Sequence, residues 1–118
     1  MGSLPPPIVQ LDGVYKRYRS EGPDVLQGIS LVLRPGTVNF VCGPSGVGKS
    51  TLLHIAGLMD RPTSGSVTFL GSPVNYSAPD ALCRARIVGV GFMFQFHYLL
   101  ENLSVRENIL LPRWMKEG

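Results

Sequence analysis

The stretch that decides the fold of this 118-residue chain is Gly43-Pro44-Ser45-Gly46-Val47-Gly48-Lys49-Ser50, followed by Thr51. It fits the pattern G-x-x-x-x-G-K-[ST], a phosphate-binding loop that needs a buried strand before it and a helix that starts inside it. The short, mostly apolar run Val38–Cys42 predicts that strand. Four apolar residues then share one face of a predicted helix, namely Leu52, Ile55, Ala56 and Met59. The sequence therefore predicts a strand, a phosphate loop and a helix in that order.

The residue types in this loop suit a triphosphate ligand. Gly43, Gly46 and Gly48 have no Cβ, so the backbone can take positive φ and wrap its N–H groups around an anion. The start of the helix adds free N–H groups and a partial positive charge. We expect Lys49 to reach the β- and γ-phosphates, and the Ser50 hydroxyl to be a hard oxygen ligand for Mg²⁺. The alternative interpretation is a glycine-rich turn before a core helix.

Composition narrows the function classes. Eleven Lys and Arg against eight Asp and Glu give a formal charge of +3, which is too small to indicate a nucleic-acid partner. The hydrophobic content of 44% can supply one modest core, although a phosphate-loop ATPase sheet usually needs a longer chain. No uninterrupted apolar stretch approaches the roughly 20 residues of a membrane span, and the start lacks the pattern of a signal peptide. Cys42 and Cys83 are expected to be reduced core thiols.

The N-terminal part predicts two antiparallel strands. Residues 1–7 are proline-rich and are expected to form a disordered lead-in. Apolar and polar residues alternate from Ile8 to Tyr15 and again from Ile29 to Leu33, the period of half-buried strands. Pro35-Gly36 then turns the chain into the strand before the phosphate loop.

The loop between these two strands is basic and aromatic. It carries Lys16, Arg17 and Arg19 beside two tyrosines, a composition that also occurs on RNA-binding surfaces. No second basic and aromatic strand accompanies it, so we interpret the loop as a solvated edge. His54 and His97 lack the spacing of a metal pair, and neither is expected to be a ligand.

After the phosphate-loop helix, the sequence predicts two more strands and two more helices. The strands are Val67–Phe69 and the buried run Val90–Phe94, which ends at Gln95. Capping-box spacings at Ser77 and Ser104 start the helices. The first helix is expected to run through Arg86, and the second to be stopped or kinked by Pro112.

Four features in order along the chain resemble the N-terminal half of an ATP-binding cassette (ABC) transporter ATPase. They are Tyr18, the phosphate loop (the Walker A motif), Pro62-Thr63-Ser64-Gly65 and Phe92-Met93-Phe94-Gln95. The resemblance extends from Ile8 to Met115. Residues 96–112 look most like the subgroup that contains lipoprotein-releasing and macrolide-export ATPases.

The resemblance implies an α/β fold, the truncated P-loop NTPase core of an ABC ATPase with an N-terminal antiparallel β subdomain. Residues 8–118 are expected to form the N-terminal part of a nucleotide-binding domain. The sequence contains no Leu-Ser-Gly-Gly-Gln-type signature, no Walker B strand ending in Asp-Glu and no switch histidine of the H-loop. No catalytic residue is therefore identified.

The resemblance also implies ATP and Mg²⁺ as cofactors. In this family an aromatic residue at the place of Tyr18 stacks on adenine, and Gln95 matches a glutamine that touches Mg²⁺ or the attacking water. Ser50 and Gln95 are therefore the expected Mg²⁺ ligands. The residues expected to bind ATP are Tyr18, Gly43, Pro44, Ser45, Gly46, Val47, Gly48, Lys49, Ser50 and Thr51.

The implied partners are a membrane permease subunit or domain and, in the complete protein, a second nucleotide-binding domain, with no nucleic acid. The implied location is cytoplasmic, peripheral at the cytoplasmic face of the inner or plasma membrane. In the subgroup, the segment after Gln95 lies near the groove that receives the coupling helix of the permease.

Two functions remain open from the sequence. In the first, the chain belongs to the ATP-binding subunit of an ABC transporter, which couples ATP binding and hydrolysis to membrane export or lipoprotein release. In the second, it is a non-catalytic nucleotide-binding or permease-docking fragment, a truncated product. In either case we expect the isolated chain to hydrolyse ATP negligibly. A phosphate-loop kinase of small molecules would explain neither Tyr18 nor the segment around Gln95.

Overall fold

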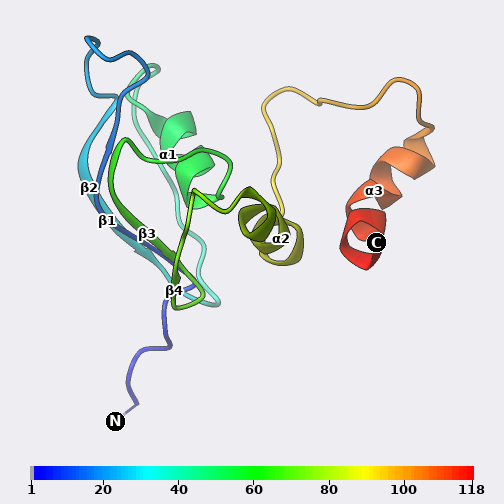
Figure 1. The fold of residues 1–118 in the computed structure, drawn as a ribbon, viewed down its shortest axis with the longest axis horizontal. Coiled ribbons are helices and arrows are strands. Elements are labelled where there is room, and N and C mark those ends of the chain that lie inside the picture. The colour runs from blue at the N-terminus through cyan, green and yellow to red at the C-terminus, as the bar shows by residue number, and fades with distance from the viewer. Residues whose placement is uncertain (1) are drawn as a thin grey trace.

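A four-stranded antiparallel sheet forms one side of the molecule in the computed structural model, which describes residues 2–118 (Figure 1). Its strands are β1 (Val9–Lys16), β2 (Leu26–Leu33), β3 (Ser64–Phe69) and β4 (Ser72–Pro73), in the spatial order β2-β1-β3-β4. Every neighbouring pair is antiparallel. The predicted N-terminal antiparallel pair and the predicted strand at Val67–Phe69 are confirmed. In the predicted lead-in, Gly2–Pro7 form no helix or strand, and Met1 lies outside the described residues.

A bulge in β1 changes which of its side chains face the core. Relative to β2, β1 has one extra residue between Leu11 and Val14, and Gly13 takes a φ of 55° there. Buried positions are odd-numbered before the bulge and even-numbered after it. The simple alternation predicted as far as Tyr15 is therefore wrong beyond Gly13, and Lys16 is buried while Tyr15 is exposed.

The core lies between the sheet and α1 (Lys49–Ala56). Its buried apolar side chains are Val9, Leu11, Val14, Leu26, Ile55, Ala56, Leu58, Val67 and Phe69. Burying one side chain of the size of Ile55 stabilises a fold by roughly 1.5–3 kcal/mol. Ile55 and Ala56 confirm the predicted apolar face of this helix, whereas Met59 lies beyond its end and is exposed. This packing holds α1, and with it the phosphate loop, against the sheet.

Two further helices follow, α2 (Pro79–Gly89) and α3 (Val105–Glu117). Figure 1 shows α3 on the far side of the molecule from the sheet, after a long extended connection. The radius of gyration of 16.0 Å exceeds the roughly 13 Å of a compact chain of this length, so the chain as a whole is loosely packed. α3 continues through Pro112, so of the two outcomes predicted for this residue, a stop is wrong. None of the helices in residues 2–118 has both the length and the apolar character needed to cross a bilayer.

Two segments that the sequence predicts as buried strands form no strand. Phe40 in Val38–Cys42 is 86% exposed, and Met93 in Val90–Phe94 is 94% exposed. An interior strand needs hydrogen-bonded partners, and none of the described strands pairs with either segment. The prediction of two buried strands is therefore wrong for this chain. Cys42 lies in the first segment and is exposed, so its prediction as a core thiol is wrong as well.

Of the two predicted capping boxes, only the one at Ser104 is confirmed. α2 begins after Ala78, which makes no side-chain cap, and Pro79 takes the first helical position in place of a box from Ser77. At the start of α3, the Glu107 N–H donates to Ser104 Oγ and the Ser104 N–H donates to Glu107 Oε1, each at 3.1 Å. This reciprocal pair satisfies two backbone donors that the helix itself leaves free.

The capping box makes the start of α3 sensitive to pH. The backbone and side-chain hydrogen bonds from Ser104 hold the pKa of Glu107 below its ordinary value of 4.5. A carboxyl with a depressed folded pKa stabilises a fold above its unfolded pKa, and that contribution is lost as the pH falls through the folded pKa. We expect the Ser104 amide resonance to titrate with a midpoint below pH 4.5 in an NMR pH series. Glu107→Gln keeps an acceptor without the charge, so a Ser104 titration that persists unchanged in this variant would contradict the assignment.

Candidate functional site

The phosphate loop leads directly into the N-terminus of α1. Gly48 caps the helix with a φ of 96°, and no side chain bonds to the free N–H groups of its first turn. A Cβ at Gly48 would lie 2.9 Å from the Val25 carbonyl oxygen, so a larger residue does not fit without displacement. Free N–H groups and a partial positive charge at a helix start are the arrangement that binds phosphate.

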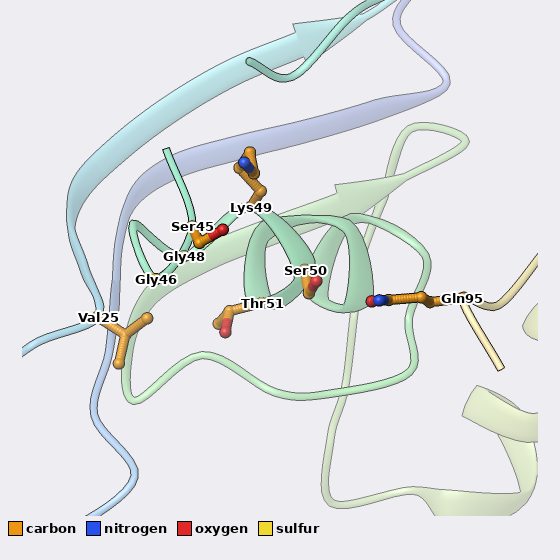
Figure 2. Close-up of a pocket in the computed structure, with 8 residues that line it drawn as sticks. All are labelled: Val25, Ser45, Gly46, Gly48, Lys49, Ser50, Thr51 and Gln95. Atoms are coloured by element: carbon orange, nitrogen blue, oxygen red, sulfur yellow. The ribbon is translucent and has the colours of Figure 1, made fainter. Parts of the chain in front are cut away.

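A pocket of about 450 Å³ opens at this helix start (Figure 2). It lies within the size range of small-molecule sites, roughly 300–1,000 Å³. The lining residues are Val25, Ser45, Gly46, Gly48, Lys49, Ser50, Thr51 and Gln95. Among the predicted ATP-binding residues, Tyr18, Gly43, Pro44 and Val47 are outside this lining. The structure thus brings most of the predicted loop and the distant Gln95 to one pocket.

The ammonium group of Lys49 is folded back onto the loop. Its Nζ donates to the Gly43 carbonyl and, at 3.2 Å, to the Pro44 carbonyl. Figure 2 shows the Lys49 side chain turned away from Ser50 and Thr51. Phosphate oxygens are charged acceptors and form stronger hydrogen bonds with an ammonium group than carbonyls do. An entering triphosphate can therefore take over this cation from the loop.

Ser50 and Gln95 bring two neutral oxygen donors to the same pocket. Figure 2 shows the Gln95 amide pointing toward the side of α1 that carries Ser50. Hydroxyl and amide oxygens are hard donors that suit Mg²⁺, which keeps several waters and shares phosphate oxygens in nucleotide sites. Residues 2–118 hold no group of three or more His, Cys, Asp or Glu that could bind a metal alone. The donor set therefore fits a Mg²⁺ ion that arrives with a polyphosphate.

A row of aromatic rings determines where Gln95 lies. The Phe92 ring lies 5.5 Å from the His54 ring of α1 and 4.7 Å from the Phe94 ring, measured between centroids. Phe94 meets Tyr98 edge-on at 5.0 Å. Such pairs are each worth about 0.5–1.5 kcal/mol beyond the area they bury. The rings hold this segment beside α1 without strand pairing, and His54 has a packing role there.

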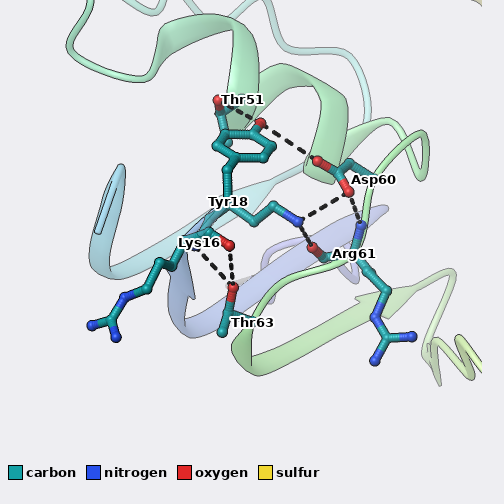
Figure 3. Close-up of polar contacts among 7 residues, drawn as sticks. Lys16, Tyr18, Thr51, Asp60, Arg61 and Thr63 are labelled. Atoms are coloured by element: carbon teal, nitrogen blue, oxygen red, sulfur yellow. Dashed lines mark hydrogen bonds and ion pairs between the residues drawn. The ribbon is translucent and has the colours of Figure 1, made fainter. Parts of the chain in front are cut away.

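Tyr18 lies beside α1, just outside the pocket (Figure 3). Its hydroxyl oxygen is 2.9 Å from Thr51 Oγ1, and the residue is 59% exposed. Thr51 is only 8% exposed and itself lines the pocket. The tyrosine predicted to stack on a base is therefore tied to the helix that is predicted to hold the phosphates.

Three residues at this site, Lys16, Val25 and Asp60, are not among those predicted from the sequence to bind ATP or Mg²⁺. Lys16 is interpreted from the sequence as part of a solvated edge, but it is buried and donates to Asp60 Oδ1 at 3.1 Å, so that interpretation is wrong for Lys16. Asp60 is held in the turn after α1. Val25 reaches the pocket because its N–H donates to the Lys16 carbonyl at 2.7 Å. Alternation of apolar and polar residues does not predict that Lys16 is buried, because the bulge at Gly13 changes which side chains of β1 face the core.

We expect Gly48→Ala to destabilise the fold by about 1–3 kcal/mol, because alanine is strained at positive φ and its Cβ meets the Val25 carbonyl. The free energy of unfolding in urea measures this loss. Gly36→Ala is the matched control, since Gly36 has a φ of 70° with nothing within 4 Å of an added Cβ. It should therefore lose stability through strain alone. Equal losses in the two variants would show that the contact with Val25 is unimportant.

The chain is similar to proteins of one family over most of its length. The family model described as ABC transporter matches residues 26–118. The lipoprotein-releasing system ATP-binding protein LolD 1 of Rhodopseudomonas palustris is 40% identical over 114 residues, which are 94% of this chain and 50% of that protein. The macrolide export ATP-binding/permease protein MacB of Nitrosomonas europaea is 43% identical over 110 residues, 91% of this chain and 17% of that protein.

Solved structures agree with these sequence similarities. The dimeric structure of MJ0796, a bacterial ABC transporter cassette, matches with a TM-score of 0.86 at 35% identity, over 92% of this chain and 47% of that chain. The same cassette in a post-hydrolysis state, bound to ADP and Pi, matches with a TM-score of 0.85. This chain spans about half the length of the LolD protein and of the cassette.

Proposed function

This chain belongs to the ABC transporter family, and we propose that residues 8–118 are the ATP- and Mg²⁺-binding half of a nucleotide-binding domain. The fold is a truncated α/β P-loop core of the ABC ATPase type, with an antiparallel sheet formed by β1 to β4. Its similarity to LolD and MacB supports the ATP-binding subunit of a transporter as the setting of this domain.

The observation that carries the proposal is that three polar residues, Lys49, Ser50 and Gln95, line one pocket. Lys49 and Ser50 come from the first turn of α1, and Gln95 comes from a segment after α2. The pocket lies at a helix N-terminus whose N–H groups have no side-chain cap. A cation, hard oxygen donors and free N–H groups together suit a metal-bound polyphosphate better than any neutral ligand.

Each residue has a separate task in the proposed complex. The backbone N–H groups of Gly46, Gly48 and Lys49 bind the phosphates, and Lys49 Nζ adds a positive charge. Ser50 and Gln95 hold Mg²⁺, which, when bound, neutralises charge on the phosphate oxygens. Tyr18 supplies an exposed ring beside the loop on which the base stacks.

The proposed partners follow from what the relatives are. LolD is the ATP-binding protein of a lipoprotein-releasing system, MacB combines ATP binding with a permease, and the cassette MJ0796 is dimeric. By analogy, the complete protein works with a membrane permease subunit or domain and a second nucleotide-binding domain, at the cytoplasmic face of the membrane. ATP binding and hydrolysis would there drive export or lipoprotein release.

The alternative function is a non-catalytic nucleotide-binding or permease-docking fragment. The exposed apolar segments Val38–Cys42 and Val90–Phe94 favour neither function, since both functions leave them without strand partners in this chain. The coding DNA beyond the codon for Gly118 discriminates between the two. A signature motif and an Asp-Glu strand encoded there, in any frame or as a separate chain, would favour an interrupted or split ATPase. Their absence would favour the fragment.

A titration of the chain with a fluorescent ATP analogue tests the proposed site. We expect saturable binding that ATP and inorganic tripolyphosphate both reverse, because the phosphates supply most of the contacts. Removing Mg²⁺ with a chelator should weaken the binding, because in the proposed complex Ser50 and Gln95 act on the phosphates through the metal. Binding that is indifferent to Mg²⁺, or that tripolyphosphate cannot reverse, would contradict the proposal.

A further inference from the structure

We propose that Lys16 is a positioning residue for the nucleotide base. Its ammonium group, anchored by Asp60, lies over one face of the Tyr18 ring and leaves the opposite face for the base. This inference rests on the proposed ATP site at the phosphate loop and concerns the part of that site that reads the base. Figure 3 shows the residues that carry it.

The position of the Lys16 ammonium group is fixed by two acceptors. Nζ donates to Asp60 Oδ1 at 3.1 Å and to the Arg61 carbonyl at 2.8 Å, and the Lys16 side chain is only 10% exposed. Asp60 is itself held, because its Oδ1 accepts the Arg61 N–H at 2.8 Å. An ammonium group has three N–H donors, so two acceptors leave one donor for the aromatic ring.

The Tyr18 ring is held at two places. Lys16 Nζ lies over the ring, 5.0 Å from its centroid, within the range of a cation–π interaction. The Tyr18 hydroxyl lies 2.9 Å from Thr51 Oγ1 on α1, and 3.5 Å from Asp60 Oδ2. Rotation of the ring would break one of these contacts. The plane of the ring is therefore set before any ligand arrives.

This arrangement favours a base on the free face of Tyr18. One face of the ring is taken by the cation, so an aromatic base has the opposite face for stacking. A cation also draws π-electron density toward itself, which reduces the repulsion between the outer face and the electron-rich face of a stacked base. Thr51 belongs to the first turn of the phosphate-loop helix and contacts Tyr18. The ring that would stack on the base is therefore held in a fixed position relative to the helix that would bind the phosphates.

A purely structural role explains Lys16 less well. The end of β1 is already fixed to the start of β3 by Thr63, whose N–H donates to the Tyr15 carbonyl at 2.8 Å. The Thr63 hydroxyl oxygen also accepts the Arg17 N–H at 2.9 Å. One buried ion pair adds little net stability to a fold, because desolvation of the two charges offsets most of their attraction. The contact of Lys16 with Tyr18 is the one that neither Thr63 nor the sheet supplies.

Calorimetric titration of the full chain with ATP and with inorganic tripolyphosphate, both in the presence of Mg²⁺, tests the proposal. Tripolyphosphate has no base, so the ratio of the two affinities isolates base recognition. We expect Lys16→Met to lower the affinity for ATP by about 3- to 10-fold and to leave that for tripolyphosphate unchanged. Lys16→Arg keeps a cation and should retain most of the ratio. Arg19→Met removes one exposed positive charge from the loop that follows β1 and should leave the ratio unchanged.

The dependence on Tyr18 separates positioning from a general charge effect. In a Tyr18→Leu background, Lys16→Met should change the ratio no further. A ratio that stays the same in Lys16→Met, or that changes equally with and without Tyr18, would overturn the proposal.

If circular dichroism shows that Lys16→Met does not fold, Asp60→Asn is measured instead. It should lower the ratio by a smaller factor, and an unchanged ratio would count against the proposal. Failure of the wild-type chain to bind either ligand would reject the ATP site itself, and this inference with it.

Discussion

Lys49→Ala is expected to weaken the binding of ATP with Mg²⁺ by about 10- to 100-fold. Hydrogen bonds to charged groups are worth about 1.5–3 kcal/mol, and each 1.4 kcal/mol is a factor of ten in affinity. In the free chain, Lys49 Nζ is bound to the carbonyls of Gly43 and Pro44, so nucleotide binding exchanges these acceptors for charged phosphate oxygens. Alanine loses the whole of that gain.

Lys116→Ala is the matched control for this experiment. Lys116 is an exposed lysine near the end of α3, and it does not line the pocket at the phosphate loop. Its removal takes away the same formal charge, so it should leave the affinity for ATP nearly unchanged. The far-ultraviolet circular dichroism of both variants should match that of the wild type. Equal affinity in the wild type and in Lys49→Ala would show that the nucleotide binds elsewhere.

The second large effect concerns catalysis. We expect the purified chain to turn over ATP at less than about 0.1 s⁻¹, against roughly 10 s⁻¹ for a typical enzyme. Phosphoryl transfer depends on positioning and on charge stabilisation, and residues 1–118 include no Walker B carboxylates, no signature motif and no switch histidine. A missing general base alone removes about 10²- to 10⁴-fold of rate.

Phosphate release by the wild type and by Lys49→Ala, purified in the same way, measures this rate. Both should give the same background, because residues 1–118 lack the Walker B carboxylate that is expected to activate water. A rate that is high in the wild type and is lost in Lys49→Ala would mean that this chain contains a complete catalytic centre. That result would contradict the assignment of residues 8–118 to the binding half of the domain.

The local parts of the fold could be predicted from the sequence, whereas the parts that depend on distant partners could not. β2 and β3 each pair with β1 within the chain, so the alternation of apolar and polar residues is sufficient to locate these three strands. The apolar runs Val38–Cys42 and Val90–Phe94 carry the composition of interior strands, but composition cannot supply the neighbours that a strand needs. The bulge at Gly13 was missed for another reason. The apolar positions move from Val9 and Leu11 to Val14 across Gly13, and a prediction of strict alternation as far as Tyr15 overlooks this shift.

The candidate site also contains residues that could be predicted from the sequence and residues that could not. Lys49, Ser50 and Thr51 were predicted because the phosphate-loop pattern fixes their places at the start of one helix. Gln95 was predicted through family resemblance alone, and the rings of Phe92 and Phe94 bring it to the pocket. Lys16 and Asp60, 44 residues apart, pair only because the bulge turns Lys16 inward.

The exposed apolar segments also bear on how the chain behaves in solution. Phe40 and Met93 belong to runs that lie unpaired at the surface, and such edges promote association between chains. Nucleotide binding is therefore best measured at low protein concentration, with the state of the chain checked by light scattering. Aggregation would lower the number of binding sites in a titration, whereas loss of Lys49 would lower the affinity.

The most direct test of the central claim is to map ATP onto the backbone by NMR. Two-dimensional ¹H–¹⁵N spectra of the labelled chain are recorded during a titration with ATP and Mg²⁺. If the phosphates bind at the start of α1, the amide resonances of Gly46, Gly48 and Lys49 should shift most, and tripolyphosphate should shift the same three. Spectra in which these amides stay in place while others move, or in which nothing moves, would contradict an ATP site at this loop.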